Sequence, residues 1–426
     1  MMNSCRIIVF LLLMLGFQTS SCATLRSVTL NKSRPIKEQM KSANTNYIIK
    51  YIFDLNGASL AIPKNCILTF RRGEIKNGKI QGNDTKIKSG KQLILDKVNL
   101  YGTWENDTVY SEWLHFIPGV KSDNKVEFQN LMTLANGKTF THLFMQTGIY
   151  YCSVAKESSF IKVPSNVYWH NKATICQIGT DLTRYSLVLI NKSNNVIIDG
   201  GLFIGDVKCH IDKGGEWGHG IKVAGSSNVT LKNLSCNEFW GDGIDLIEGT
   251  YRTDIRAGET VCSNVIIDNV KCLRNRRTGL SIEAARNVVV RNSEFAYTGF
   301  LKMTAPGDGL GIEPWCKNEQ KIYNITIDKC NIHDNKGGRD LSIQPNIQYY
   351  YKDDNPQHHP KSRINVRNSK VGNLYILFSN ELRINDCVVD DIVRYGCSDD
   401  VLISNSLVKK HTDRRNKKGL TLKNNR

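Results

Sequence analysis

The stretch that decides the fold runs from Asn195 to Gly200 and reads Asn-Val-Ile-Ile-Asp-Gly. In order, its pattern is a polar residue, an apolar residue, any residue, a second apolar residue, any residue, and then Asn, Asp or Gly. Further copies of the pattern, some looser, begin at Asn228, Asn264, Asn287, Asn324, Arg363, Glu381 and Asp400. Alternation with a period of two residues predicts short strands with one buried face. Repetition of one such unit predicts a solenoid, and Asn at its corners suits a tight turn in the left-handed region.

Two more strands follow each copy. The second strand has one aligned apolar position, occupied by Cys236, Cys272, Phe295, Ile332, Val371, Val389 and Val408. A neighbouring column holds small and apolar residues, among them Cys330 and Cys387. We therefore predict that these four cysteines are buried as small hydrophobic residues and have no redox role.

The third strand has its own motif, which reads Trp-Gly-His-Gly-Ile-Lys-Val from Trp217 and Trp-Gly-Asp-Gly-Ile-Asp-Leu from Trp240. Related segments begin at Thr278, Asp308 and Arg339. Apolar residues in these segments are predicted to point inward in two columns: Ile221, Ile244, Leu280, Leu310 and Leu341, and then Val223, Leu246, Ile282, Ile312 and Ile343. The residues between them must then point outward.

The repeat resembles the pectate-lyase-like superfamily of right-handed β-helix proteins over about residues 190–408. A short helix expected at 125–136 and the segments 148–150 and 163–167 look like the N-terminal cap of that superfamily. The resemblance implies an all-β fold: a right-handed single-stranded parallel β-helix, or pectin-lyase-like solenoid, with a small N-terminal β region and a cap helix. It does not decide the activity, because the superfamily includes polysaccharide lyases, glycoside hydrolases, epimerases and phage tailspikes.

The N-terminus is predicted to be an export segment. Arg6 precedes an apolar run from Ile7 to Phe17 that is too short to span a bilayer, and small residues precede Cys22. We expect residues 1–21 to be a signal peptide of lipoprotein type, with Cys22 lipidated; ordinary secretion is the alternative. The expected location is therefore secreted, or at the cell surface or outer membrane of a Gram-negative bacterium, with membrane contact only through the lipid anchor. Residues 23–113 are then an N-terminal β region, 114–408 the parallel β-helix and 409–426 a basic tail.

Charge and cysteine content restrict the partners. The net charge is +17, of which the tail 409–426 carries +7 and Arg6 carries +1, so the body carries +9. That excess is compatible with an acidic polysaccharide, and an exported protein has no expected nucleic-acid partner. The tail is expected to be solvated and disordered. Eleven cysteines remain beyond the export segment without a Cys-x-x-Cys pair, which argues against a zinc site and a complete disulfide framework.

The outward face of the third strand gathers the candidate catalytic residues: Asp242, Asp245, Glu283, Asp308 and Glu313. Strands spaced about 4.8 Å apart place Glu283 over Glu313, and like charges so close raise one pKa. The same geometry puts Asp245 roughly 8 Å from Glu283, which suits an inverting glycosidase. A solvated acidic ladder or a calcium site is the alternative interpretation.

Candidate substrate-binding residues surround these carboxylates: Trp217, His219, Lys222, Trp240, Trp315 and Arg339. Aromatic faces beside a carboxylate groove suit sugar rings, although Trp217 and Trp240 are equally compatible with packing at a turn. The column Gly220, Gly243, Gly279 and Gly309 predicts either a bare floor for an extended ligand or a turn before each strand.

We therefore expect a polysaccharide-degrading enzyme, with a carboxylate-based glycoside hydrolase favoured. The first alternative is a polysaccharide lyase acting by β-elimination on uronic acids, in which His219, Lys222 and Arg339 would neutralise or deprotonate the substrate. The second alternative is a non-catalytic glycan-binding or adhesive surface protein. No cofactor is required by the sequence, and calcium is the one metal that the acidic face suggests.

Overall fold

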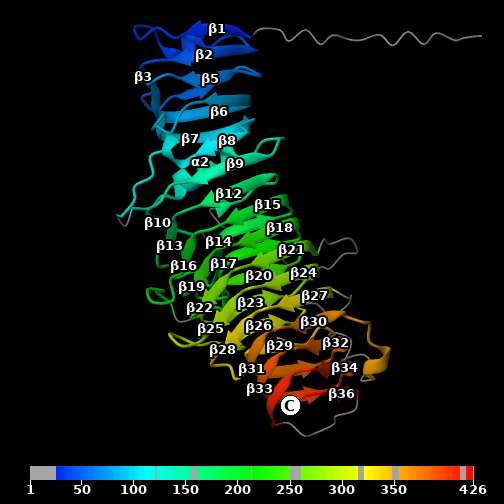
Figure 1. The fold of residues 1–426 in the computed structure, drawn as a ribbon. Coiled ribbons are helices and arrows are strands. Elements are labelled where there is room, and N and C mark those ends of the chain that lie inside the picture. Colours follow the sequence, from blue (N-terminus) through cyan, green and yellow to red (C-terminus); the bar gives the residue numbers. More distant parts are fainter. Residues whose placement is uncertain are drawn as a thin grey trace, which may run out of the picture.

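A computed structural model describes residues 25–119, 122–154, 161–212, 214–249, 261–314, 321–347, 355–412 and 419–425. The chain winds into a long solenoid of stacked coils, which Figure 1 shows running from the N-terminal strands to the C-terminus. Each coil in the middle of the solenoid contributes three strands, as in β18 (Ser227–Lys232), β19 (Ser235–Asn237) and β20 (Ile244–Ile247). The predicted right-handed parallel β-helix is confirmed.

Two long parallel sheets form the body of the solenoid among the described residues. The 12-stranded sheet takes the first strand of each coil: β8 (Thr108–Tyr110), β9 (Thr141–Met145), β12 (Val167–Asn171), β15 (Asn194–Asp199), β18, β21 (Cys262–Asp268), β24 (Ala285–Arg291), β27 (Ile322–Asp328), β30 (Ile364–Arg367), β32 (Asn380–Asn385), β34 (Asp399–Ser404) and β36 (Leu420–Lys423). The 17-stranded sheet takes the second and third strands: β10 (Ile149–Cys152), β11 (Ile161–Lys162), β13 (Thr174–Gln177), β14 (Arg184–Asn191), β16 (Leu202–Ile204), β17 (Trp217–Ala224), β19, β20, β22 (Lys271–Leu273), β23 (Thr278–Ile282), β25 (Glu294–Ala296), β26 (Asp308–Ile312), β28 (Asn331–His333), β29 (Leu341–Ile343), β31 (Lys370–Leu377), β33 (Val388–Gly396) and β35 (Leu407–His411).

The corner residue at the start of each repeat has a positive φ in all eight copies, between 48° at Asp400 and 63° at Glu381. Asn tolerates this left-handed conformation better than most residues. Its side chain also bonds to the coil before: Asn228 Nδ2 donates to Asn195 Oδ1 at 3.2 Å, and Asn264 Nδ2 donates to Asn228 Oδ1 at 3.1 Å. The corner residues therefore form a ladder of side-chain hydrogen bonds along the outside of the solenoid.

The core is one continuous apolar column inside the coils. Both predicted inward columns of the third strand are fully buried, as at Ile221 and Val223. Cys236, Cys272, Cys330 and Cys387 are also buried, and burial raises the pKa of Cys272 and of the other three thiols. A protonated thiol is a small hydrophobic group, so the prediction of core cysteines is confirmed.

The N-terminal β region is also a parallel stack, but with shorter coils. It contains β1 (Arg26–Thr29), β2 (Thr45–Ile49), β3 (Ile52–Asp54), β4 (Ser59–Ala61), β5 (Ile67–Phe70), β6 (Glu74–Lys88) and β7 (Leu95–Trp104), with the short helix α1 (Ile36–Gln39) after β1. Residues of β2 pair with β5, and β5 pairs with the end of β6. Its apolar residues belong to the same core as the long sheets.

Helix α2 (Lys125–Leu134) confirms the helix expected at 125–136, and it packs on the last N-terminal strand, β7. The amide of Asn130 accepts from the Leu100 N–H at 2.8 Å and donates to the Val98 carbonyl at 2.7 Å. These bonds satisfy backbone groups at the edge of a sheet that would otherwise be unpaired. Short 3₁₀ turns lie at η1 (Ser111–Trp113) and η2 (Pro356–His358).

The basic tail is partly ordered, which corrects the expectation that all of it is disordered. Strand β35 extends to His411, and β36 pairs in parallel with β34 because its Leu420 and Leu422 continue the alternation of the repeat. The predicted signal peptide, Cys22 and Trp315 lie outside the described residues. Within the part of the chain that is described, no helix combines the length and the apolar character needed to cross a bilayer.

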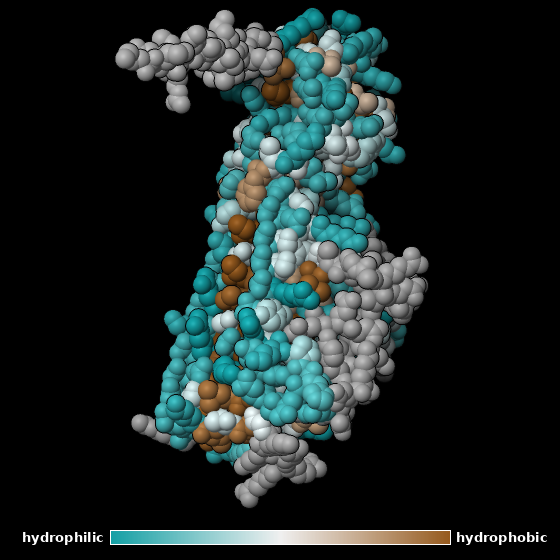
Figure 2. Space-filling model, turned by 90° about the vertical axis from the view of Figure 1, so that its right-hand side faces the viewer, coloured by the Kyte–Doolittle hydropathy of each residue, from teal (hydrophilic) through white to brown (hydrophobic). Residues whose placement is uncertain are grey.

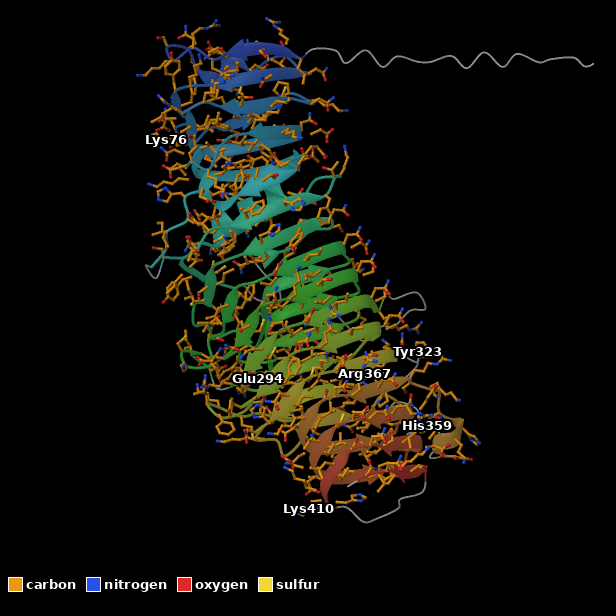
Figure 3. The ribbon with its side chains drawn as sticks, in the orientation of Figure 1. Lys76, Glu294, Tyr323, His359, Arg367 and Lys410 are labelled. Atoms are coloured by element: carbon orange, nitrogen blue, oxygen red, sulfur yellow. The ribbon has the colours of Figure 1, made fainter. Side chains whose placement is uncertain are left out.

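The outer face of the 12-stranded sheet is mainly hydrophilic. Figure 2 looks onto this side of the solenoid and shows a row of apolar residues among polar ones. Charged side chains pair from coil to coil, as Arg291 does with Asp268 at 2.8 Å and Arg367 with Asp328 at 3.2 Å. Figure 3 shows side chains along the solenoid, with Arg367 at the end of β30 and Lys410 near the C-terminal end. These paired charges are typical of a solvated sheet face and do not form a site.

Candidate active site

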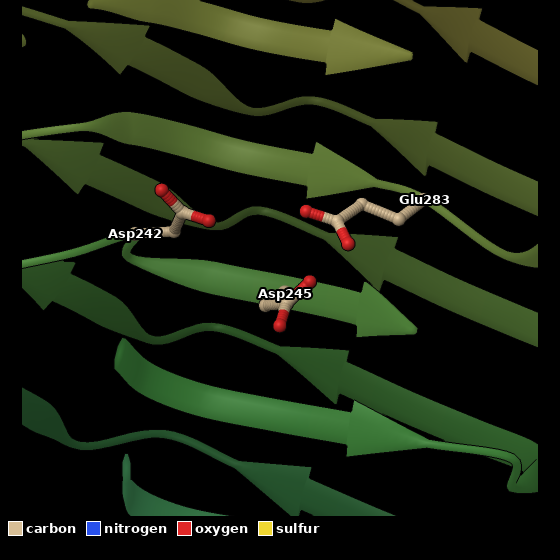
Figure 4. Close-up of side chains that lie close together, drawn as sticks. All are labelled: Asp242, Asp245 and Glu283. Atoms are coloured by element: carbon tan, nitrogen blue, oxygen red, sulfur yellow. The ribbon is translucent and has the colours of Figure 1, made fainter. Parts of the chain in front are cut away.

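Three carboxylates come together on the outer face of the 17-stranded sheet. Asp242 lies just before β20, Asp245 lies on β20, and Glu283 follows β23 in the next coil (Figure 4). One carboxylate oxygen of each lies within 4.8 Å of the others. The separation of Asp245 and Glu283 is thus shorter than the roughly 8 Å expected from strand spacing, because the two side chains lean toward each other.

Arg277 holds two of the three acids. Its Nη1 donates to Asp242 Oδ2 at 2.6 Å, and its Nη2 lies 3.7 Å from Glu283 Oε1. Ser281, in register with Asp245 on the next coil, donates its hydroxyl to Asp242 Oδ2 at 3.0 Å. The register of β20 and β23 therefore sets the positions of the carboxylates, and Arg277 contacts both Asp242 and Glu283.

His219 and Lys222 approach the acids from the preceding coil. Lys222 Nζ lies 3.3 Å from Asp245 Oδ2. Burial, and then the positive charge of Lys222, hold the pKa of His219 well below its usual value, so this imidazole is neutral at neutral pH. Its Nδ1 accepts from the Asp242 N–H at 3.1 Å, which leaves the proton on Nε2, 3.8 Å from Asp245 Oδ2. His219 is therefore a neutral neighbour of the acids and does not supply a cation.

The cluster holds more negative than positive groups. Three carboxylates face Arg277 and Lys222, and Asp242 and Asp245 are almost completely buried. Burial raises the pKa of Glu283 well above its usual value, and the nearby Asp245 raises it further while Arg277 lowers it. Burial also raises the pKa of Asp242, against the opposing charge of Arg277. The arrangement thus favours one bound proton, most readily on Glu283, whose side chain is the most exposed of the three at 13%.

Two oxygens of the cluster are buried without a hydrogen-bond partner among the described residues: Asp242 Oδ1 and Asp245 Oδ1. Buried carboxylate oxygens ordinarily have a partner. Oxygen ligands of this kind suit a hard cation such as calcium. Asp242, Asp245 and Glu283 therefore fit the donor set that such an ion requires.

The next coil carries the other two predicted acids, which are not among the three whose oxygens lie within 4.8 Å of one another. Asp308 is buried and accepts from Arg339 Nε at 2.8 Å; burial raises its pKa to about 7 although Arg339 lowers it. Glu313 is exposed and accepts from Gln344 Nε2 at 3.3 Å. Stacking of Glu283 over Glu313 was expected to raise one pKa. The pKa of Glu283 is raised, but by burial first and then by Asp245.

The tryptophans differ from one another in exposure. Trp240 is buried, with only 2% of its surface exposed. The His210 ring stacks on it with 3.9 Å between the ring centroids, and the Cζ of Arg276 lies 3.9 Å from the Trp240 ring centroid. This coverage favours the alternative of packing at a turn over contact with a sugar. Trp217 is half-buried, with Arg184 over its ring at 4.4 Å.

The glycine column does not form a floor. A Cβ on Gly220 would lie 2.5 Å from the carbonyl oxygen of Gly243, and one on Gly243 would lie 2.7 Å from that of Gly279. A Cβ on Gly279 would lie 2.4 Å from the carbonyl oxygen of Gly309. Each glycine therefore permits close stacking on the next coil, and the interpretation of a bare ligand surface is corrected.

Arg277 is the functional residue that the sequence reasoning missed. Its signal was its place directly before Thr278, at the start of a third strand whose outward residues were already candidates. A long side chain two positions before Gly279 reaches the same face as the outward residues of the strand.

Fold and site together define a right-handed parallel β-helix protein with a buried carboxylate cluster on one face. Residues 184–348 match the family model for the right-handed β-helix region, and this segment contains the whole cluster.

Two curated proteins of Bacillus subtilis (strain 168) are similar in sequence. The chain is 33% identical over 154 residues to the uncharacterized protein YclG, covering 34% of this chain and 26% of that protein. It is 27% identical over 260 residues to the SPbeta prophage-derived uncharacterized protein YorA, covering 58% of this chain and 38% of that protein. The chain thus spans well under half of the length of either relative.

Solved structures with a similar fold include the tailspike protein gp49 from the Acinetobacter baumannii bacteriophage Fri1, a capsular polysaccharide depolymerase. It is 12% identical, with a TM-score of 0.48, over 75% of this chain and 59% of that chain.

Proposed function

We propose that the protein is a glycoside hydrolase acting on a polysaccharide, with its catalytic centre at Asp242, Asp245 and Glu283. The observation that carries the proposal is the meeting of three buried carboxylates, each with one oxygen within 4.8 Å of the others, around one arginine. Glycoside hydrolysis needs a carboxylic acid to protonate the leaving oxygen and a carboxylate to act as base or nucleophile. A solenoid face that continues on both sides of the cluster suits a long linear substrate.

The roles follow from the environment of each acid. Glu283 is the general acid, because it is the most accessible of the three and the one that most readily keeps its proton. Asp245 is the base or nucleophile, and Lys222 at 3.3 Å stabilises its charge. Asp242 is engaged by Arg277 and Ser281, so it is a positioning residue that fixes the guanidinium beside Glu283.

The test is a digestion of a panel of linear polysaccharides by the full chain, with reducing ends and ultraviolet absorbance recorded together. A hydrolase releases reducing ends without an unsaturated product. Glu283→Gln and Asp245→Asn are expected to lower the rate about 100- to 10,000-fold, the usual contribution of a general acid or base. Glu294→Gln, at an ion pair with Lys271 outside the cluster, is the matched control and keeps the rate. Full activity in both cluster variants would overturn the proposal.

The two unpartnered oxygens favour a second candidate, a polysaccharide lyase assisted by a cation. Asp242, Asp245 and Glu283 would hold a calcium ion, whose chemistry is to neutralise the carboxylate of a uronic acid. Lys222 Nζ lies 3.3 Å from Asp245 Oδ2, its side chain is 12% exposed, and it is the candidate base of this reaction. An ultraviolet-absorbing product that requires added calcium, and a calcium-dependent rise in melting temperature absent from Asp245→Asn, would favour the lyase over the hydrolase.

A further inference from the structure

Two arginines converge on one tyrosine farther along the same face. Tyr375 on β31 is half-buried, with the Cζ of Arg339 5.2 Å and that of Arg394 5.5 Å from its ring centroid. Tyr375 is in register with Ser342, which is in register with Gly311, the neighbour of Ser281. Tyr375 therefore lies three coils, or about 14 Å, beyond Ser281 and the coil of Glu283, on the same column.

A β-bulge places Arg394 in this position. On β31 and β33, Leu374 is paired with Ile392, but Tyr375 is paired with Arg394, so that Val393 is the extra residue. Without the bulge, the half-buried Val393 would stand beside Tyr375. Bulges re-aim side chains and are frequent next to functional sites. Here the bulge replaces an apolar neighbour with an exposed guanidinium.

The charge of Arg394 is not neutralised within the described residues. Asp391, on the same strand, is engaged by the Thr412 hydroxyl and by Lys410 at 3.4 Å. Asp390 is paired with Lys409 at 2.6 Å. Arg339 shares its charge with Asp308. Arg339 precedes β29 and Arg394 lies on β33, the two strands that pair with β31 on either side, so the two guanidinium groups flank Tyr375. An anion bound beside Tyr375 would accept their N–H groups.

We propose that Arg339, Tyr375 and Arg394 form a distal subsite for an anionic group, a carboxylate or sulfate, on the polysaccharide. The proposal rests on the function proposed above, in that the anion belongs to a sugar a few residues from the bond that is cleaved. The ring of Tyr375 keeps the guanidinium groups in place by cation–π contact, and their N–H groups select for charge. The preferred substrate is therefore an acidic polysaccharide.

The experiment measures binding by affinity electrophoresis in the full chain carrying Glu283→Gln, so that the probes stay intact. The probes are polygalacturonate, alginate, chondroitin sulfate and carrageenan, each with its carboxyl-reduced or desulfated counterpart. At least one charged probe is expected to bind more tightly than its neutral counterpart. Arg394→Gln is expected to raise the Kd for that charged probe about tenfold and to leave the neutral counterpart unchanged. Arg394→Lys keeps the charge without the planar fork and is expected to recover part of the loss.

Arg26→Gln, at an exposed arginine on the first strand, is the control and keeps the affinity. Equal binding of charged and neutral probes, no binding to any probe, or an equal effect of Arg394→Gln and Arg26→Gln would overturn the subsite. If the unmutated chain cleaves a glycan but one of these binding results is found, the subsite is overturned and the proposed hydrolase is retained. If binding is charge-selective and depends on Arg394 but no glycan is cleaved, the hydrolase is overturned and the subsite is retained.

Discussion

Arg277 Nη1 lies 2.6 Å from Asp242 Oδ2, although 35 residues separate the two in the chain. The same guanidinium reaches Glu283 through its other nitrogen. One buried positive charge therefore lowers the pKa of two acids that burial would otherwise raise further. The balance between this arginine and the low polarity of its surroundings sets the protonation of the cluster.

Replacement of Arg277 by Gln is expected to move the basic limb of the pH–activity profile to higher pH. Loss of the positive charge raises the pKa of Glu283, the general acid, so Glu283 keeps its proton to higher pH. The measurement is the rate of reducing-end release against pH. Arg274→Gln, at an exposed arginine that contacts Tyr297, serves as the control. A profile that loses height without any shift would show that Arg277 acts only as a structural residue.

Stability is expected to fall as the pH rises from about 4 to 7. Burial raises the pKa of Asp308 from 3.8 to about 7, so the folded chain binds a proton that the unfolded chain releases in this window. Asp308→Asn is expected to reduce the fall by about 3 kcal/mol. Denaturant unfolding at both ends of the window measures the difference. Asp54→Asn, at an acid whose pKa is lowered in the folded chain, is not expected to reduce it.

Gly243→Ala is expected to destabilise the solenoid by about 2 kcal/mol or more, because the added Cβ would lie 2.7 Å from the Gly279 carbonyl oxygen. Gly311→Ala is the matched variant, since its Cβ would meet nothing closer than 3.7 Å. Thermal melts of both variants compare the two sites. Equal melting temperatures would contradict the close-stacking role of the glycine column.

Asn264→Ala is expected to cost about 2 kcal/mol, since it removes two ladder bonds and places a less suited residue at a φ of 54°. Asn264→Gly restores the backbone freedom without the side chain. Unfolding free energies of the two variants separate the contributions: Gly should recover the part due to the left-handed conformation, and the remainder belongs to the ladder. No loss in either variant would mean that the ladder contributes nothing to stability.

The sequence by itself determined the solenoid, its three strands per coil and the residues that point inward. That was possible because a strand has a period of two and a repeat displays the same pattern many times, as from Asn228 to Asp400. It also selected Asp242, Asp245 and Glu283, because outward positions on neighbouring coils must share a face.

Only the tertiary structure decided which candidates lie together. Strand spacing fixes where the Cα atoms lie, but not the length or the torsion angles of the side chains. The sequence could therefore not show that Asp245 and Glu283 lean toward each other, or that Arg277 contacts both Asp242 and Glu283. It also could not show that Asp308 and Glu313 are not part of this group. Burial likewise depends on what packs above each residue. This is why Trp240 proved to be covered, and why the glycine column proved to serve stacking between coils.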